Sequence, residues 1–268
     1  MLKSRLCIAF FAFAVGCAPA QKPLTDYVNP MLGTATLWDS VDLGFKPTKR
    51  TWGAEVFPGS ALPNAMVQVS PVTKFHSGAG YQYEDSVIYG FTHTNKGHWN
   101  LCHIPLLPVT GTPTPGDYCS PFSHERESAA PGYYQVFLDR YGVDAQLSST
   151  LRCAFHKYTY PAGAAPAVLA DLQRSNEHVR AWDIRKEGDN VFAGWQQTGE
   201  KMYFYAVANR PVTGIEPVVE GDREVRIVRF GEGDGALELR IGFSFVSEKN
   251  ARENLEAEML GKSFAEGR

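Results

Sequence analysis

The segment Leu237-Glu-Leu-Arg-Ile-Gly-Phe-Ser-Phe245 alternates apolar residues with polar or small ones at every position. A period of two places successive side chains on opposite faces of a strand, so this segment predicts a β-strand with one buried face. Glu224–Phe230 shows a similar pattern, in which Arg226 and Arg229 interleave with apolar residues. We expect both segments to lie in a sheet that is covered on one side.

Further segments of this kind follow one another from Gly132 onward, and the chain before that point is rich in turns. Roughly a dozen strands without a helical period between them predict an all-β fold, a large antiparallel β-sandwich. Glu187–Asn190 and Gly231–Gly235 predict hairpin-like turns between neighbouring strands. The expected strands are Ala65–Val69, Ser86–Thr92, Ile104–Val109, Tyr133–Leu138, Val143–Leu151, Phe155–Tyr160, Ala167–Leu172, Val179–Arg185, Val191–Gln197, Met202–Ala208, Glu224–Phe230 and Ala236–Val246.

One helix is expected after the last strand. Ser247 can cap it, Ala251, Leu255 and Met259 recur at helical spacing, and Gly261 ends it. A terminal helix of this kind can pack on an edge of the β domain or connect it to a further domain.

Composition excludes several classes of protein. The chain has 268 residues, 44% of them hydrophobic, and a formal net charge of −3. The apolar content suffices for a core, which excludes a disordered chain. The slight acidity argues against nucleic acid as a partner, since phosphate neutralisation needs a basic surplus.

The first 20 residues predict an export signal. Lys3 and Arg5 precede the apolar run Leu6–Gly16, which is too short to span a bilayer. Ala18-Pro-Ala20 fits a cleavage site, whereas Ala14-Val-Gly-Cys17 resembles a lipoprotein signal that would place a lipid on Cys17. We therefore expect a periplasmic protein or one anchored by lipid at the outer membrane or cell surface, with no other membrane contact.

Three cysteines remain beyond this signal: Cys102, Cys119 and Cys153. An odd number cannot pair completely within one chain. A Cys102–Cys119 bridge is permitted in an oxidising compartment, but we expect buried free thiols.

The segment Gly90–His103 concentrates three histidines, Trp99 and two asparagines. One interpretation is a metal site, but the histidine spacing of five residues matches no common zinc motif. Another is a sugar-contacting loop, in which Trp99 stacks on a pyranose while His98 and Asn100 bond its hydroxyls. A purely structural loop explains the composition equally well. The metal interpretation uses His93, His98, Cys102 and His103.

A second polar cluster contains Glu125 and Glu127. On a strand, residues two apart share a face, and paired carboxylates are the groups that glycosidases use. Such pairs normally come from different segments, so we favour a structural polar network over catalysis.

Several motifs resemble glycoside hydrolase family 92, in order and over almost all of the chain after the signal. The matching segments are Asp26–Thr34, Phe57–Gly59, Asn64–Pro71, Gly80–Tyr83, Ile88–Thr94, Phe122–Glu125, Ala130–Tyr134, Phe155–Tyr158 and Phe245–Glu256. The resemblance implies a supersandwich of the galactose-mutarotase-like type with a C-terminal connector helix. It divides the chain into a signal peptide (1–20), an N-terminal β-sandwich domain (21–246) and a linker helix (247–268).

The family consists of calcium-dependent, inverting exo-α-mannosidases, in which a helical (α/α) barrel follows the sandwich. Calcium and the catalytic carboxyls belong to that barrel, so the resemblance implies neither in this chain. The sandwich lends a loop to the interdomain site, and in α-1,2-mannosidases a Trp from it contacts the leaving sugar. Trp99 stands at the matching place, flanked by His98 and Asn100.

Three functional hypotheses follow. In the first, the chain is the N-terminal domain of an exported α-mannosidase that degrades mannose-containing N-glycans, and it is not catalytic without its C-terminal catalytic domain. In the second, it is a free-standing surface carbohydrate-binding module. In the third, it is a self-sufficient hydrolase that uses Glu125 and Glu127.

Overall fold

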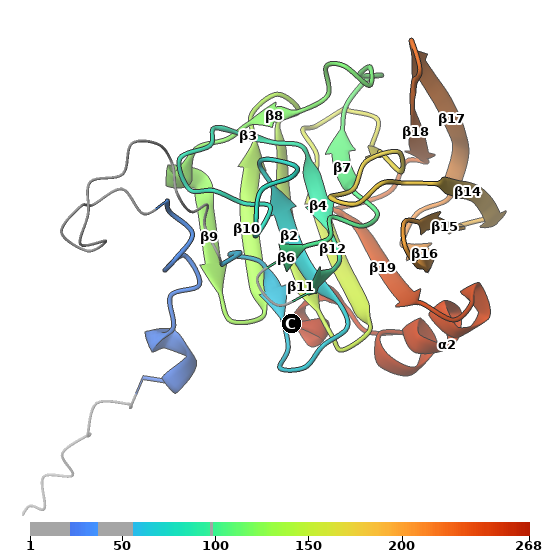
Figure 1. Ribbon diagram of the computed structural model, residues 1–268. Helices are drawn as coiled ribbons and strands as arrows, with labels where there is room; N and C mark the ends of the chain where they lie inside the picture. The colour runs from blue at the N-terminus through green and yellow to red at the C-terminus, as the bar shows by residue number, and fades with distance from the viewer. Residues whose placement is uncertain (1–21, 37–55, 97–98) are drawn as a thin grey trace, which may run out of the picture.

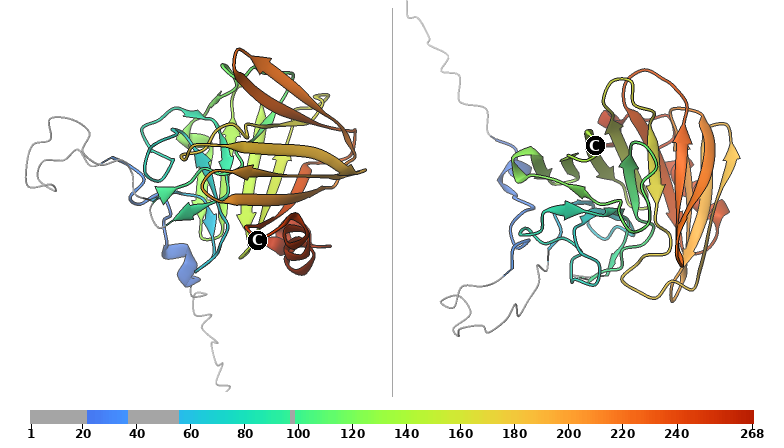
Figure 2. Two further views of the ribbon diagram at one scale, coloured as in Figure 1. Left: turned by 45° about the vertical axis from the view of Figure 1, so that its right-hand side comes forward. Right: turned by 90° about the horizontal axis from the view of Figure 1, so that it is seen from above.

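The computed structural model describes residues 22–36, 56–96 and 99–268. Two antiparallel sheets pack face to face in this part of the chain (Figures 1 and 2). The structure therefore confirms the expected all-β sandwich. The predicted signal peptide and Cys17 lie outside the described residues, as does His98.

The first sheet has seven strands and the second has eight. In spatial order, the first consists of β1 (Ser60–Ala61), β2 (Gln68–Val72), β4 (Gly90–Thr92), β7 (Leu106–Val109), β13 (Ala167–Ala170), β18 (Arg223–Phe230) and β17 (Val212–Glu220). The second consists of β14 (Ala181–Gly188), β15 (Val191–Gln197), β16 (Lys201–Ala208), β19 (Leu237–Ser244), β12 (Cys153–Thr159), β11 (Val143–Ser149), β10 (Tyr133–Leu138) and β9 (Glu127–Ala130).

Shorter elements lie outside the two main sheets. Two small ladders pair β3 (Val87–Ile88) with β8 (Ser120–Pro121), and β5 (Asn95–Lys96) with β6 (Trp99–Asn100). The helical segments are η1 (Leu24–Tyr27), η2 (His124–Arg126), α2 (Glu248–Glu258) and α3 (Phe264–Gly267). Within the described residues, no helix is long and apolar enough to cross a bilayer.

Strand β19 explains how the two faces of its sheet are covered. Its apolar residues, Leu237, Leu239, Ile241 and Phe243, are fully buried between the sheets. On its other face, Gly242 lies under α2, where an added Cβ would approach the carbonyl oxygen of Ala251 to 2.1 Å. The helix packs on the sheet this closely because Gly242 has no side chain.

The predicted C-terminal helix is confirmed. The Ser247 side chain accepts a hydrogen bond from the Asn250 amide at its start, and Ala251 and Leu255 are buried against the sheet. The helix lies across the face of the second sheet, beside β16 and β19, and not along an edge (Figure 1). Its role as a connector to a further domain stays a prediction.

The two hairpin predictions had different outcomes. Glu187–Asn190 does turn between the paired strands β14 and β15. The prediction for Gly231–Gly235 was wrong, because this segment leads from β18 in the first sheet to β19 in the second. Face-to-face sheets lie roughly 10 Å apart, so the segment spans the sandwich and does not close a ladder.

Strand β17 was not expected from the sequence. It contains Gly214 and Pro217, residues that weaken a strand pattern. The structure tolerates them because β17 is the edge of the first sheet, and its ladder with β18 shifts register between Val212 and Gly214.

Candidate functional site

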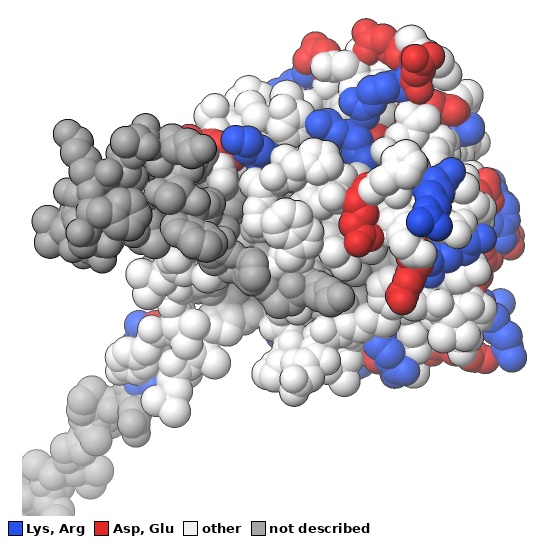
Figure 3. All heavy atoms as spheres, in the orientation of Figure 1, with Lys and Arg blue, Asp and Glu red and all other residues white. Residues whose placement is uncertain are grey.

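The hairpin β5–β6 brings Trp99 to the surface. Lys96 pairs with Trp99 and Asn95 with Asn100 in this ladder. The Trp99 side chain is 40% exposed, a large value for so apolar a residue. Figure 3 shows that the part of this face around β6 carries few charged side chains, which gather towards its margins.

Asn100, the second residue of β6, is fully buried. Its Oδ1 accepts a hydrogen bond from the Cys102 amide at 2.7 Å, and its Nδ2 donates to the Ala79 carbonyl at 3.2 Å. Trp99 therefore lies at the surface, whereas the side-chain amide of Asn100 is engaged in hydrogen bonds within the protein. A contact between Asn100 and substrate stays a prediction.

The backbone after the hairpin is strained. Cys102 and Ile104 have φ values of 54° and 53°, in the left-handed region that non-glycine residues avoid. Each such residue costs on the order of 1–3 kcal/mol and persists only when its surroundings hold it. The Ile104 amide donates to Oε1 of Gln196 at 2.8 Å, which is one such restraint.

The loop between β13 and β14 supplies further restraints. Asn176 donates from Nδ2 to the Asn100 carbonyl at 2.6 Å, and its Oδ1 accepts from the His76 amide at 2.6 Å. Ser175 donates to the Leu101 carbonyl, also at 2.6 Å. The base of the Trp99 hairpin is therefore fixed by residues that lie more than seventy positions away in sequence.

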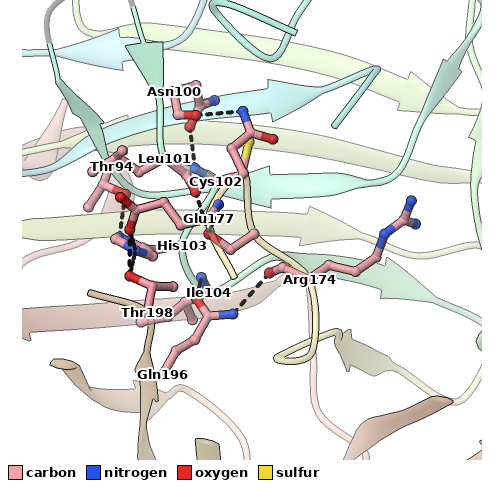
Figure 4. Close-up of polar contacts among 12 residues, drawn as sticks. Thr94, Asn100, Leu101, Cys102, His103, Ile104, Arg174, Glu177, Gln196 and Thr198 are labelled. Carbon is pink, nitrogen blue, oxygen red and sulfur yellow. Dashed lines mark hydrogen bonds and ion pairs between the residues drawn. The ribbon is translucent and has the colours of Figure 1, made fainter. Parts of the chain in front are cut away.

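A chain of side-chain hydrogen bonds runs beneath the hairpin, from Thr94 through His103 and Thr198 to Glu177 (Figure 4). Thr198 donates its only hydroxyl proton to Oε2 of Glu177 at 2.6 Å, so it accepts from Nε2 of His103 at 3.0 Å. Burial lowers the pKa of His103, although Glu177 opposes this shift. Neutral His103 then accepts from the Thr94 hydroxyl at Nδ1, 2.9 Å away.

A second chain lies deeper in the sandwich. Nε2 of His93 is 3.0 Å from Nε2 of His156, and Nδ1 of His156 is 2.5 Å from the Tyr158 hydroxyl. All three residues are fully buried. Desolvation lowers the pKa of His93 to about 3 and that of His156 well below its ordinary value, so both imidazoles are neutral.

The structure separates the described residues of the metal interpretation. His93 points into the core, His103 bonds two threonines, and buried Cys102 packs with Val72 and Phe75. Among the described residues, no group of three His, Cys, Asp or Glu is placed to hold a metal ion. Cys102, Cys119 and Cys153 are all free, so the alternative Cys102–Cys119 bridge is absent.

Glu125 and Glu127 do not share a strand face, contrary to that expectation, because Glu125 belongs to η2 and Glu127 begins β9. The Glu127 side chain is only 2% exposed. It accepts hydrogen bonds from the hydroxyls of Tyr81 at 3.0 Å and Tyr134 at 2.6 Å, and it lies 2.5 Å from Nδ1 of His124. This is the structural polar network that the sequence favoured.

Comparison with known proteins decides the family. The model of the glycosyl hydrolase family 92 N-terminal domain matches residues 27–252. The chain belongs to this family. No curated protein sequence matches it.

Solved structures agree with the family assignment. The family 92 α-mannosidase BT3965 from Bacteroides thetaiotaomicron, in complex with mannoimidazole, superposes with a TM-score of 0.77 at 25% identity. The match covers 91% of this chain and 35% of that one. The inverting mannosidase BT2199 from the same species has a TM-score of 0.73 at 22% identity, with 91% and 35% coverage, and shows the same fold. This family 92 chain thus spans about a third of the mannosidases it resembles.

The His-rich segment is conspicuous in the sequence, whereas the residues that hold it in place are not. Glu177 and Thr198 lie in loops between strands, and no motif links them to His103. Only the pairing of distant strands brings these loops together. The expected strands Ala167–Leu172 and Val179–Arg185 leave a loop between them, but nothing in the sequence shows which backbone groups Ser175 and Asn176 bind.

Proposed function

We propose that the chain is the sugar-facing N-terminal domain of an exported, calcium-dependent, inverting exo-α-mannosidase of the α-1,2 type, and that it is not catalytic alone. The observation that carries this proposal is the exposed Trp99 on a hairpin with a fixed base. An exposed indole offers a flat apolar face for the C–H side of a pyranose. In this proposal Trp99 contacts the leaving sugar, and His98 and Asn100 flank the contact.

The chemistry of inversion supports a second domain. Inverting glycosidases hold two carboxyl groups about 6.5–9.5 Å apart with a water between them. Glu127 is closed to solvent and bound by three donors, so it cannot serve as one of that pair. The proposal therefore assigns the general acid and base to a C-terminal (α/α) barrel.

Calcium belongs to that barrel in this account. In the part of the chain that the structure describes, no group of three or more His, Cys, Asp or Glu side chains is placed to hold a metal ion. Calcium dependence is accordingly proposed for the complete enzyme only.

Exposed apolar side chains support a covering partner. Leu24, Tyr27, Val28 and Leu32 are each more than half exposed and lie in the N-terminal segment that precedes the sandwich. Clustered exposure of large apolar residues marks surfaces that bind other protein surfaces. We propose the catalytic barrel of the same enzyme as their partner.

Export completes the proposal. Residues 1–20 direct the protein to the periplasm, or Cys17 carries a lipid that anchors it to the outer membrane or cell surface. A mannose-containing glycan such as an N-glycan is its substrate there.

The test is the coding sequence downstream of Arg268 and the enzyme it produces. A continuous reading frame for a helical domain supports the proposal, and a stop codon directly after Arg268 contradicts it. In the extended enzyme, Trp99→Ala should lower kcat/KM for α-1,2-mannobiose by about tenfold or more. An aryl α-mannoside, which lacks the second sugar, is the control substrate and should be affected much less.

The free-standing carbohydrate-binding module is the alternative, and the exposed Trp99 also favours it. A titration of tryptophan fluorescence with mannose distinguishes the two, using the chain and its Trp99→Ala variant. Millimolar or tighter binding that is lost in the variant favours a module. Absence of Trp99-dependent binding favours a half-site that needs its partner domain.

A further inference from the structure

A cavity of about 450 Å³ opens beside the hairpin, which places it within the volume range of small-molecule sites. Thr94 and Leu101 line it from the hairpin side, and Glu177 from the β13–β14 loop. The turn after β15, Phe245, and Ala65 and Met66 from the chain before β2 also line it. Segments far apart in sequence therefore converge on one space.

The Glu177 carboxylate is held in position, but one of its oxygens is still available to accept a hydrogen bond. Its Oε2 accepts from Thr198, and Nε2 of His103 lies 3.6 Å away. Thr198 and His103 are both almost fully buried, whereas the Glu177 side chain is 42% exposed. Within the described residues Oε1 has no hydrogen-bond partner, so it can accept from a ligand in the cavity.

The remaining wall has the chemistry of a sugar site. The Phe245 ring is 37% exposed and offers an apolar face. Glu200 adds a second carboxylate to the lining. Ionised carboxylates only accept hydrogen bonds, so the cavity suits hydroxyl donors and disfavours anions. A pyranose combines hydroxyl donors with an apolar C–H face.

Asn95 also borders this cavity, and neither polar atom of its amide has a hydrogen-bond partner among the described residues. A buried amide without partners costs free energy. Its atoms are closed to solvent in this structure, so Asn95 is not among the ligand contacts proposed for the cavity.

We propose that this cavity binds a neutral hexopyranose, with two neighbouring hydroxyls on the Glu177 carboxylate and the C–H face against Phe245. The choice of mannose as the hexose rests on the proposed function. Glu177 then adds a sugar contact that is separate from the one assigned to Trp99.

The experiment is an NMR titration of the isotopically labelled chain with methyl α-mannopyranoside. Millimolar binding should shift the amide signals of Thr94, His103 and Thr198. Glu177→Gln, which keeps the shape of the side chain, should weaken it about tenfold, and Phe245→Ala should weaken it as well. Glu216→Gln, on the outer strand β17, is the matched control and should change nothing.

The proposal would be overturned if no amide signals shift at the highest sugar concentration. It would also be overturned if wild type and Glu177→Gln bind the sugar with equal affinity. Binding that depends on Trp99 but not on Glu177 would overturn the cavity and favour the free-standing module over the proposed function. Binding that depends on Glu177 but survives Trp99→Ala would support the cavity. Mannose release by the chain alone would count against the proposed function and not against the cavity.

Discussion

The imidazole rings of His93 and His156 meet between the two sheets, with their Nε2 atoms 3.0 Å apart. His156 lies on β12 of the second sheet, and His93 directly follows β4 of the first. Since each ring is fully buried, protonation of either would place a charge in the core without a counter-ion.

This pair predicts a loss of stability in acid. Burial lowers the pKa of His93 to about 3, against 6.5 for the ordinary side chain, and lowers that of His156 as well. The unfolded chain therefore binds more protons below pH 6.5. The free energy of unfolding should fall by roughly 1.4 kcal/mol per pH unit for each histidine, from about pH 6.5 down towards pH 3. Urea unfolding between about pH 7.5 and pH 5 measures this slope.

His156→Gln should reduce the slope, because one of the two neutral imidazoles is gone. His178→Gln is the matched control, since it removes an exposed histidine of the β13–β14 loop and leaves the buried pair intact. A free energy of unfolding that is constant over this pH range would show that the pair does not titrate as described.

Gly242→Ala should destabilise the fold by about 1–3 kcal/mol, because α2 would have to move away from β19. The new Cβ would lie 2.1 Å from the Ala251 carbonyl oxygen and 2.8 Å from Cβ of Leu255. Gly214→Ala is the matched control, because its Cβ would meet nothing within 4 Å. Equal melting temperatures for the two variants would disprove the close packing of α2.

Glu127→Gln should cost about 1–3 kcal/mol of stability, because an amide NH₂ would replace an acceptor that faces three donors. Thermal unfolding of the variant measures the loss. Glu125→Gln, at an exposed position of η2, should have no measurable effect. Equal stability of both variants would mean that the polar network around Glu127 contributes nothing.

Asn176→Ala should loosen the base of the Trp99 hairpin, since the His76 amide and the Asn100 carbonyl of β6 lose their partner. Hydrogen exchange of the peptide that covers residues 92–104 should become about tenfold faster. Asn209→Ala is the matched control, because Asn209 also bonds two backbone groups, those of Ala236 and Glu238, far from the hairpin. Unchanged exchange in Asn176→Ala would rule out this support.

Most strands of the sandwich could be predicted from the sequence, because each has a local apolar or alternating pattern. Tyr133–Leu138 and Val191–Gln197 have the bounds that their patterns indicated, and the Ser247 cap was readable from local residues. Edge strand β17 was missed because Gly214 and Pro217 break the pattern, and an edge tolerates such residues.

Only part of the candidate site could be predicted from the sequence, for a different reason. Trp99 and His103 stand in one conspicuous segment, but the roles of Glu177 and Thr198 depend on contacts across more than seventy residues. Register between distant strands sets those contacts, and no local pattern in the chain encodes it.

The most direct test of the central claim is mannose release from α-1,2-mannobiose by the purified 268-residue chain in the presence of calcium. The account predicts no release above the blank, because the one carboxylate pair that the sequence singled out has a member, Glu127, buried beyond the reach of substrate. Release that grows in proportion to the chain's concentration would contradict it. The sandwich would then be an enzyme in its own right, not the sugar-facing domain of a larger one.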